Sequence, residues 1–200
     1  MELKTVYFEK PGKENTEEVL RIAKQRANEL RINTILVAST TGVTAVKAME
    51  VFNGMRVILV THSTGFKEPN FREFTEENRK IVESKKGIIL TATHAFGGLG
   101  RSMRQSDIPQ ATATYVIEDI VAKTLRVFGQ GMKVVCEIAV MAADSGLVRT
   151  DEDVISIAGT GTGDWGRGAD TAVVLQPANA HLFFDLKVKE ILCKPHFSDW

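Results

Sequence analysis

Cysteine is scarce in this 200-residue sequence, which contains only Cys136 and Cys193. Both lie in apolar surroundings, and neither has a CxxC partner. This spacing excludes a disulfide framework and the thiolate clusters of structural zinc sites. We therefore expect two buried thiols in a protein of a reducing compartment, the cytoplasm.

A net charge of either sign is also lacking. The 25 lysine and arginine residues balance 25 aspartate and glutamate residues, and the sequence pI is near 6.9. No global electrostatic field therefore favours nucleic acid or an anionic membrane, and we expect neither as a partner. The sequence has no apolar run of 18 residues, and residues 1–4 do not open a signal peptide, so we expect no membrane segment.

What the sequence has instead is a regular alternation of strand-like and helix-like segments. With 44% hydrophobic and 25% charged residues, it fits one globular domain over residues 1–200. Short apolar runs predict buried strands, and segments with helical spacing lie between them. The expected strands are 5–8, 32–38, 56–62, 88–93, 153–158 and 169–176, with an extended segment at 183–193, and the expected helices are 15–30, 44–52, 75–86, 115–128 and 132–143. This order predicts an α/β fold, a three-layer α/β/α arrangement with a mostly parallel mixed sheet.

Three segments stand out from this alternation. Helix 132–143 is apolar nearly all round, which predicts burial within the domain or against a second subunit. We expect a homo-oligomer on that basis. The stretches 63–74 and 95–110 show no clear period. Loops of this length in a compact domain are usually functional or mobile, and the sequence leaves their role open.

A loop rich in hydroxyl groups joins an expected strand to an expected helix and reads Ser-Thr-Thr-Gly-Val-Thr. Unpaired N–H groups, the positive end of a helix dipole and short hydroxyls together form a favourable anion site. The P-loop pattern G-x-x-x-x-G-K-[ST] is absent. The candidate phosphate ligands are therefore Ser39, Thr40, Thr41, Gly42, Val43 and Thr44. An ordinary Ser/Thr N-cap explains the same loop equally well.

His62 and His94 each end an expected strand as the second residue of a Thr-His pair. Parallel sheets bind ligands outside the carboxyl ends of their strands, so both histidines should lie at the same edge as the hydroxyl loop. Two histidines on different strands carry no metal-ligand spacing, and we expect no metal site. Hydrogen bonding to a ligand and a purely structural role both remain open. The order of residues shows no catalytic triad, so catalytic residues stay unassigned.

A glycine-rich turn, residues 159–168, separates the last two core strands and holds five glycines in ten residues. Its glycines satisfy G-x-G-x-x-G, but the dinucleotide fingerprint must open a helix, whereas this turn leads into a strand. Such a turn lets backbone approach a ligand closely. The candidate ligand contacts are Gly161, Thr162, Gly163, Asp164 and Trp165. The alternative is a mobile hairpin that carries a surface tryptophan.

These strands and loops together resemble the C-terminal α/β domain of pyruvate kinase. Strand 32–38, the hydroxyl loop, the following helix and strand 56–61 resemble the part of that domain in which a Ser/Thr loop opens a helix and holds an effector phosphate. Strand 153–158, the glycine-rich turn and strand 169–175 resemble its last two strands, the second antiparallel to the rest. The resemblance covers residues 14–176. It extends to stand-alone archaeal proteins of a pyruvate kinase α/β domain-like family, in which flavin mononucleotide (FMN) has been seen bound.

The resemblance implies a phosphorylated ligand, with FMN as the leading candidate. The hydroxyl loop would hold the phosphate, and residues 161–165 with His62 and His94 would line the ribityl and ring portion. Two hundred residues leave no room for the catalytic barrel of pyruvate kinase, so its phosphoryl transfer is not implied. The chain would then be a flavoprotein of unknown reaction, or a non-catalytic effector-sensing module that binds a sugar phosphate or nucleotide and acts on a partner chain.

Overall fold

The computed structural model describes residues 2–104, 116–161 and 166–197. The strands are β1 (Val6–Phe8), β2 (Thr34–Ala38), β3 (Arg56–Thr61), β4 (Ile88–Thr91), β5 (Val154–Ala158), β6 (Thr171–Gln176) and β7 (Lys187–Pro195). The α-helices are α1 (Thr16–Leu30), α2 (Val43–Val51), α3 (Glu76–Ser84), α4 (Gly98–Arg104), α5 (Ile117–Arg126) and α6 (Gln130–Asp144). Two short 3-10 helices, η1 (Lys13–Asn15) and η3 (Ala180–Asp185), complete the described elements.

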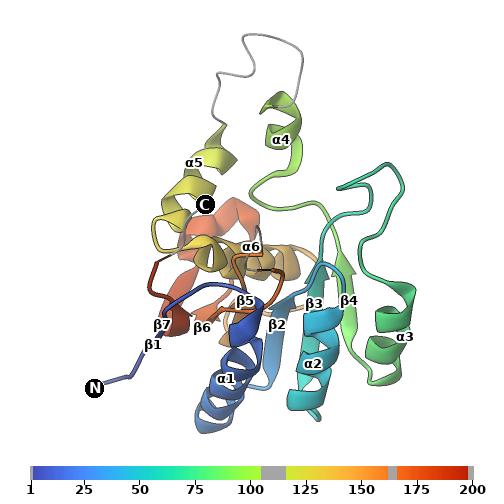
Figure 1. The fold of residues 1–200 in the computed structure, drawn as a ribbon. Helices are drawn as coiled ribbons and strands as arrows, with labels where there is room; N and C mark the ends of the chain where they lie inside the picture. Colours follow the sequence, from blue (N-terminus) through green and yellow to red (C-terminus); the bar gives the residue numbers. More distant parts are fainter. Residues whose placement is uncertain (1, 105–115, 162–165, 198–200) are drawn as a thin grey trace.

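The seven strands form one mixed sheet in the order β1-β7-β6-β5-β2-β3-β4 (Figure 1). All neighbouring pairs are parallel except β5 with β6 and β6 with β7, so β6 alone runs against the others. The mostly parallel mixed sheet and its antiparallel strand were both predicted from the sequence and are confirmed. Because β2, β3, β4 and β5 are parallel, their carboxyl ends meet at one edge of the sheet.

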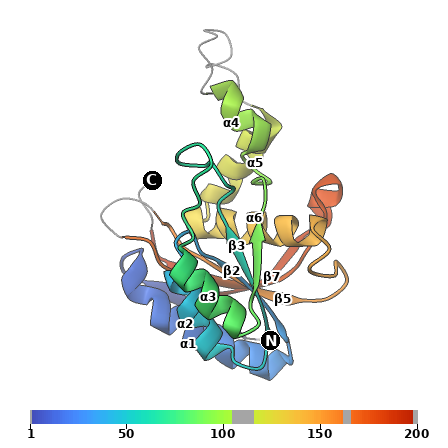
Figure 2. The same cartoon turned by 90° about the vertical axis from the view of Figure 1, so that its right-hand side faces the viewer.

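Helices cover both faces of the sheet (Figure 2). One face carries α1, α2 and α3, and the other carries α6 with α5 outside it. Successive residues of a strand point to opposite faces, so β2 sends Ile35 and Val37 into the core under α1–α3 and Leu36 into the core under α6. Both sets are fully buried. This double burial explains why the strands read as continuous apolar runs, and it establishes the three-layer α/β fold.

Helix α6 is buried along almost its whole length within this chain. One side packs on β2, β3, β5 and β6, and α5 and η3 contact it elsewhere. Of the two alternatives offered by its apolar sequence, burial within the domain is correct. It has 15 residues and carries Lys133 and Glu137. Within the described part of the chain, no helix combines the length and apolar character needed to cross a bilayer.

Both cysteines are buried free thiols, as the sequence predicts. Cys136 lies on α6 and Cys193 on β7, one in each of the two cores. Burial raises the pKa of each thiol to about 12. Neither thiol is therefore reactive as a thiolate at neutral pH.

The expected elements lie within about two residues of their observed bounds, with two differences. The first is α4, which forms inside the stretch 95–110 that was expected to be a loop; Gly98 and Gly100 lower its helix propensity and hide it from sequence analysis. The second is the segment 183–193, expected to be extended. There η3 occupies residues 180–185, and Phe183 packs edge-on against Phe96 at 5.3 Å between ring centroids.

Candidate functional site at the carboxyl edge of the sheet

The hydroxyl loop between β2 and α2 is fixed by the start of α3. The carbonyl of Thr41 accepts hydrogen bonds from Asn78 Nδ2 at 3.0 Å and from the backbone N–H of Thr75 at 3.2 Å. Gly42 then caps α2 with φ +99°, a left-handed conformation that favours glycine. A Cβ at Gly42 would also lie 2.5 Å from Cβ of Asn78. This loop therefore needs a glycine both for its backbone and for its contact with α3.

The backbone N–H groups of residues 40–44 have no acceptor among the described residues. Because the peptide is trans and the Thr41 carbonyl points to α3, the N–H of Gly42 points away from α3. Ser39 alone acts as a local cap, accepting the N–H of Ala45 at 3.2 Å through its hydroxyl. The N-cap explanation of the hydroxyl residues thus holds for Ser39 and leaves the other donors open to a ligand.

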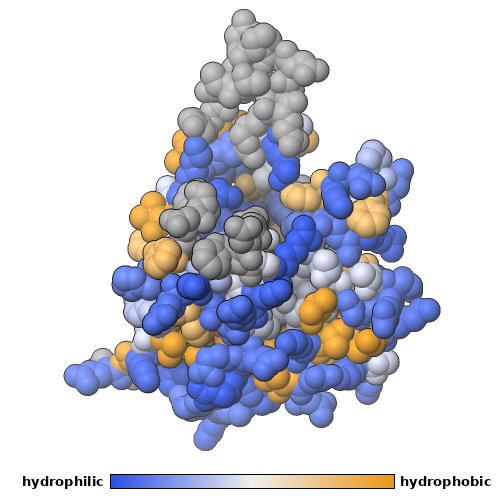
Figure 3. Space-filling view, in the orientation of Figure 1, coloured by the Kyte–Doolittle hydropathy of each residue, from blue (hydrophilic) through white to orange (hydrophobic). Residues whose placement is uncertain are grey.

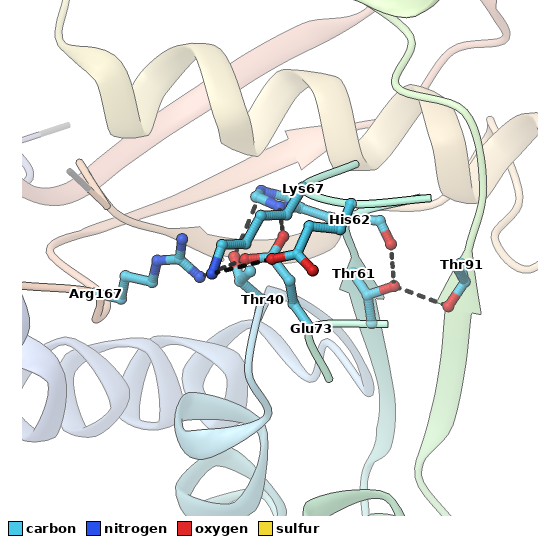
Figure 4. Close-up of polar contacts among 8 residues, drawn as sticks. Thr40, Thr61, His62, Lys67, Glu73, Thr91 and Arg167 are labelled. Carbon is cyan, nitrogen blue, oxygen red and sulfur yellow. Dashed lines mark hydrogen bonds and ion pairs between the residues drawn. The ribbon is translucent and has the colours of Figure 1, made fainter. Parts of the chain in front are cut away.

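A chain of polar side chains links this loop to two distant segments (Figure 4). Thr40 Oγ1 lies 3.5 Å from His62 Nε2, and His62 Nδ1 lies 2.7 Å from Glu73 Oε2. The other carboxylate oxygen of Glu73 accepts a hydrogen bond of 2.8 Å from Arg167. Thr61 supports the arrangement by donating its hydroxyl to the carbonyl of His62 at 2.8 Å. The site therefore combines β3, the loop 62–75 and the end of the glycine-rich turn.

Glu73 is the ionised residue at the centre of this series of side-chain contacts. Its side chain is only 8% exposed. Burial by itself raises the pKa of Glu73, but the hydrogen bonds from Arg167 and His62 outweigh it and hold the pKa below the usual value. The carboxylate consequently stays charged at neutral pH, accepts from Nδ1 of the imidazole and leaves Nε2 directed to Thr40.

Two rings, those of Phe66 and His94, pack near the ring of His62. The Phe66 ring lies 4.2 Å from the His62 ring and stacks on His94 at 5.1 Å with an interplanar angle of 17°. The two histidine rings are 5.2 Å apart. The guanidinium of Arg101, on α4, lies 4.3 Å above the Phe66 ring, a cation–π contact. Both stretches expected to be loops therefore contribute side chains that cover the histidines.

His94 has an unusual polar environment. Its Nε2 atom is buried and has no hydrogen-bond partner among the described residues. Burial lowers the pKa of His94, and the charge of Glu137 opposes this only in part. Glu137 is itself buried on α6, where it pairs with Lys133 and accepts the backbone N–H of Phe96 at 3.0 Å. Burial likewise lowers the pKa of Lys133 against the opposing effect of Glu137.

Two buried polar side chains lie at this edge where β5 ends and the antiparallel β6 begins. Asp170 is fully buried and accepts hydrogen bonds from the N–H groups of Gly12 and Thr160 and from the hydroxyl of Thr171. Thr160 is 1% exposed, yet its Oγ1 has no partner among the described residues. Since β5 pairs with β2, Thr160 lies on the strand end next to that of the hydroxyl loop.

The structure thus brings most of the sequence-predicted residues to one edge. Ser39–Thr44, His62 and His94 follow neighbouring strands, and Gly161 follows β5. Four further candidates, Thr162, Gly163, Asp164 and Trp165, lie outside the described residues. Where the chain is described, no three His, Cys, Asp or Glu side chains gather as metal ligands.

Sequence reasoning missed several members of the site, namely Glu73, Arg167, Thr160, Lys133 and Glu137. A carboxylate in the long loop after a strand-ending histidine was the one available signal for Glu73. The others reach the site only through the packing of α6 and the path of the glycine-rich turn.

Comparison with protein families agrees with this architecture. The chain matches the family described as pyruvate kinase, alpha/beta domain, over residues 17–175. The matched region begins in α1 and ends in β6, so it contains the hydroxyl loop, both histidines and the glycine-rich turn. Because the match spans most of the 200 residues, the chain belongs to the pyruvate kinase alpha/beta domain family.

Proposed function

We propose that the carboxyl edge of the sheet binds a small phosphorylated molecule, with FMN as the first candidate and its phosphate at the hydroxyl loop. The observation that carries the proposal is the run of N–H groups at residues 40–44, which have no acceptor in the described part of the chain. These donors open α2, where the helix dipole adds a positive partial charge. An anion there would receive several charge-assisted hydrogen bonds, each contributing about 1.5–3 kcal/mol.

Comparison of the helix starts supports α2 as the anion-binding helix. The first turn of α1 carries Glu17 and Glu18, and that of α3 carries Glu76 and Glu77, so both dipoles already meet negative charge. The first turn of α2 carries no acidic residue. That of α6 carries none either, but Gly131 there packs directly against Thr171. Among α1, α2 and α3, which share one face of the sheet, the start of α2 alone therefore carries no acidic residue.

The carboxylate nearest the loop, that of Glu73, is paired with a cation. Arg167 and Glu73 largely neutralise each other, and His62 lies between Glu73 and the hydroxyl of Thr40 on the loop (Figure 4). The remainder of the ligand would extend from the loop past the end of β3 toward His94, which follows β4. Among the described residues, the buried atoms His94 Nε2 and Thr160 Oγ1 have no hydrogen-bond partner. They lie on opposite sides of the hydroxyl loop, and a ligand with ring nitrogens or hydroxyls would satisfy the one that it reaches.

FMN, when bound, would supply one- and two-electron transfer, and this chain would bind and orient it. Ser39, Thr40, Thr41, Gly42, Val43 and Thr44 would hold the phosphate. His62, His94 and the turn 161–165 would line the rest. An effector-sensing module would use the same phosphate contacts for a sugar phosphate or nucleotide, without electron transfer.

The test compares FMN with riboflavin, which lacks the phosphate. We expect the purified chain to bind FMN, and the double variant Thr41→Ala/Thr44→Ala to bind it at least tenfold more weakly while riboflavin affinity changes less than twofold. Thr150→Ala, an exposed threonine at the other edge of the sheet, is the matched control and should leave both affinities unchanged. Equal losses for FMN and riboflavin would remove the phosphate from this loop. Binding of a sugar phosphate but not of FMN would favour the effector module.

A further inference from the structure

We propose that His62 is a proton-carrying ligand of the bound phosphate, so that the site selects terminal phosphate monoesters in their dianionic form. This inference rests on the proposed phosphate site and adds the ligand class and the protonation state in which it binds. It arises from the chain of contacts Thr40–His62–Glu73–Arg167, which the sequence does not reveal (Figure 4).

The first step is the fixed orientation of the imidazole. Glu73 is ionised and lies 2.7 Å from Nδ1. Nδ1 therefore carries a hydrogen and donates a hydrogen bond to the carboxylate. Nε2 is then the only ring nitrogen left to face the hydroxyl loop, where it lies 3.5 Å from Thr40 Oγ1. In neutral histidine this Nε2 has a lone pair and is an acceptor, so it would repel a phosphate oxygen, which is also an acceptor. Protonation turns the same atom into a donor aimed at the loop.

The second step is the charge around His62. Arg167 shares the Glu73 carboxylate, which prevents that carboxylate from simply repelling a phosphate. His94 faces His62 from the end of β4, and Arg101 faces it through the Phe66 ring from α4. On the loop after β3, Lys67 is paired with Glu68. Among the described residues, Glu73 is the one carboxylate hydrogen-bonded to His62, so an added phosphate is the natural second counter-ion for an imidazolium.

A terminal phosphate monoester matches these donors. A terminal monoester offers three oxygens and nearly two negative charges above about pH 6, its second pKa. It can accept the free N–H groups of the loop and the proton on Nε2 at the same time. A phosphodiester, or the pyrophosphate of a dinucleotide, has a single charge per phosphorus and a second substituent that must leave the loop. The arrangement therefore favours FMN over flavin adenine dinucleotide.

Calorimetric titration of the full chain tests the proton directly. FMN and inorganic sulfate are titrated between pH 5.5 and pH 9 in pairs of buffers that differ in ionisation enthalpy. We expect proton uptake that rises toward one proton per ligand as the pH is raised to 9, and a loss of affinity of up to about tenfold per pH unit over the range in which the proton is taken up. Sulfate remains a dianion throughout, so its affinity should not fall again below pH 6 as that of FMN does.

Variants locate the proton. His62→Gln should abolish the proton uptake and flatten the pH dependence of both ligands, while His181→Gln, an exposed histidine on η3, should retain them. Proton uptake by the unaltered protein requires no variant, so its absence overturns the inference even if His62→Gln fails to fold. Binding without proton uptake, uptake that persists in His62→Gln, or dinucleotide binding as tight as that of FMN would overturn the inference and leave the phosphate site intact. Absence of FMN and sulfate binding at every pH would instead overturn the phosphate site itself, and the inference with it.

Discussion

Gly42 meets two separate demands at the start of α2, a left-handed backbone at φ +99° and a side-chain position already filled by Asn78. Replacing it by alanine should therefore cost both backbone strain and overpacking. We expect Gly42→Ala to lower the free energy of unfolding by about 2–4 kcal/mol and to weaken FMN binding, as measured by denaturant titration and by equilibrium binding.

Gly54 supplies the matched control for this prediction. Its φ is +83°, but nothing lies within 4 Å of the Cβ that alanine would add. Gly54→Ala should cost about 1–2 kcal/mol from strain alone and leave ligand binding unchanged. If the two alanine variants lost the same stability, the contact with Asn78 would be unimportant.

His94 should make stability depend on pH. Burial lowers the pKa of His94 in the folded protein, so below pH 6.5 the unfolded chain takes up a proton that the folded chain does not. Above pH 6.5, His94 makes no contribution to the pH dependence of the free energy of unfolding. Below it, the free energy of unfolding falls as the pH decreases, by at most about 1.4 kcal/mol per pH unit. We expect His94→Gln to reduce the slope between pH 6.5 and 5 in denaturant titrations. A slope unchanged from that of the parent protein would show that His94 protonates freely in the fold.

At the scale of elements, a buried ion pair ties α6 to the connection between β4 and α4. Lys133 and Glu137 lie four residues apart on α6, both with side chains less than 10% exposed, and Glu137 accepts the N–H of Phe96. Removing one partner of such a pair leaves an uncompensated buried charge. Lys133→Met should therefore destabilise the fold by about 3–5 kcal/mol in denaturant titrations.

A double-mutant cycle separates the pair from its surroundings. Glu137→Gln keeps an oxygen for the Phe96 N–H but leaves the Lys133 ammonium without its counter-charge. The double variant Lys133→Met/Glu137→Gln buries no charge, so we expect it to recover much of the stability that either single variant loses. Losses that simply add would mean that the two side chains do not depend on each other.

The elements that sequence analysis located correctly are those whose local pattern and tertiary role agree. β2 and β3 are apolar on both faces because both faces are covered, and α6 is apolar all round because it lies between the sheet, α5 and η3. The helix α4 was missed because its glycines and its short length give no periodic signal. Its position depends instead on contacts such as that of Gly100 with Val116.

The residues of the candidate site also fall into those that the sequence predicts and those that it does not. The hydroxyl loop, His62 and His94 were predictable because topology alone places strand ends at one edge. Glu73 and Arg167 were not, because each reaches His62 from an irregular segment whose path is set by tertiary contacts. The orientation of the imidazole, and with it the proposed proton, therefore became visible only in three dimensions.

At the scale of the whole molecule, the burial of α6 changes the basis for expecting self-association. That expectation arose from the apolar sequence of α6, which this chain covers by itself. The outer side of α5 now takes its place, where apolar side chains gather at the surface (Figure 3). Ile117, Ile120 and Val127 are 76%, 56% and 79% exposed. With Thr124 they follow a 3-4-3 spacing, which is that of a helix seam for another helix.

If a second copy of this chain packed on that seam about a two-fold axis, Ile117 would meet Val127 and Ile120 would meet Thr124 of the other copy, a self-complementary contact. We expect light scattering to give twice the 22.0 kDa chain mass at micromolar concentration. Ile120→Glu places a charge in the seam and should give the single-chain mass with FMN affinity unchanged. Leu182→Glu, a similarly exposed residue on η3, should remain dimeric. A single-chain mass for the unaltered protein would refute the dimer, and loss of the dimer in both variants would move the interface away from α5.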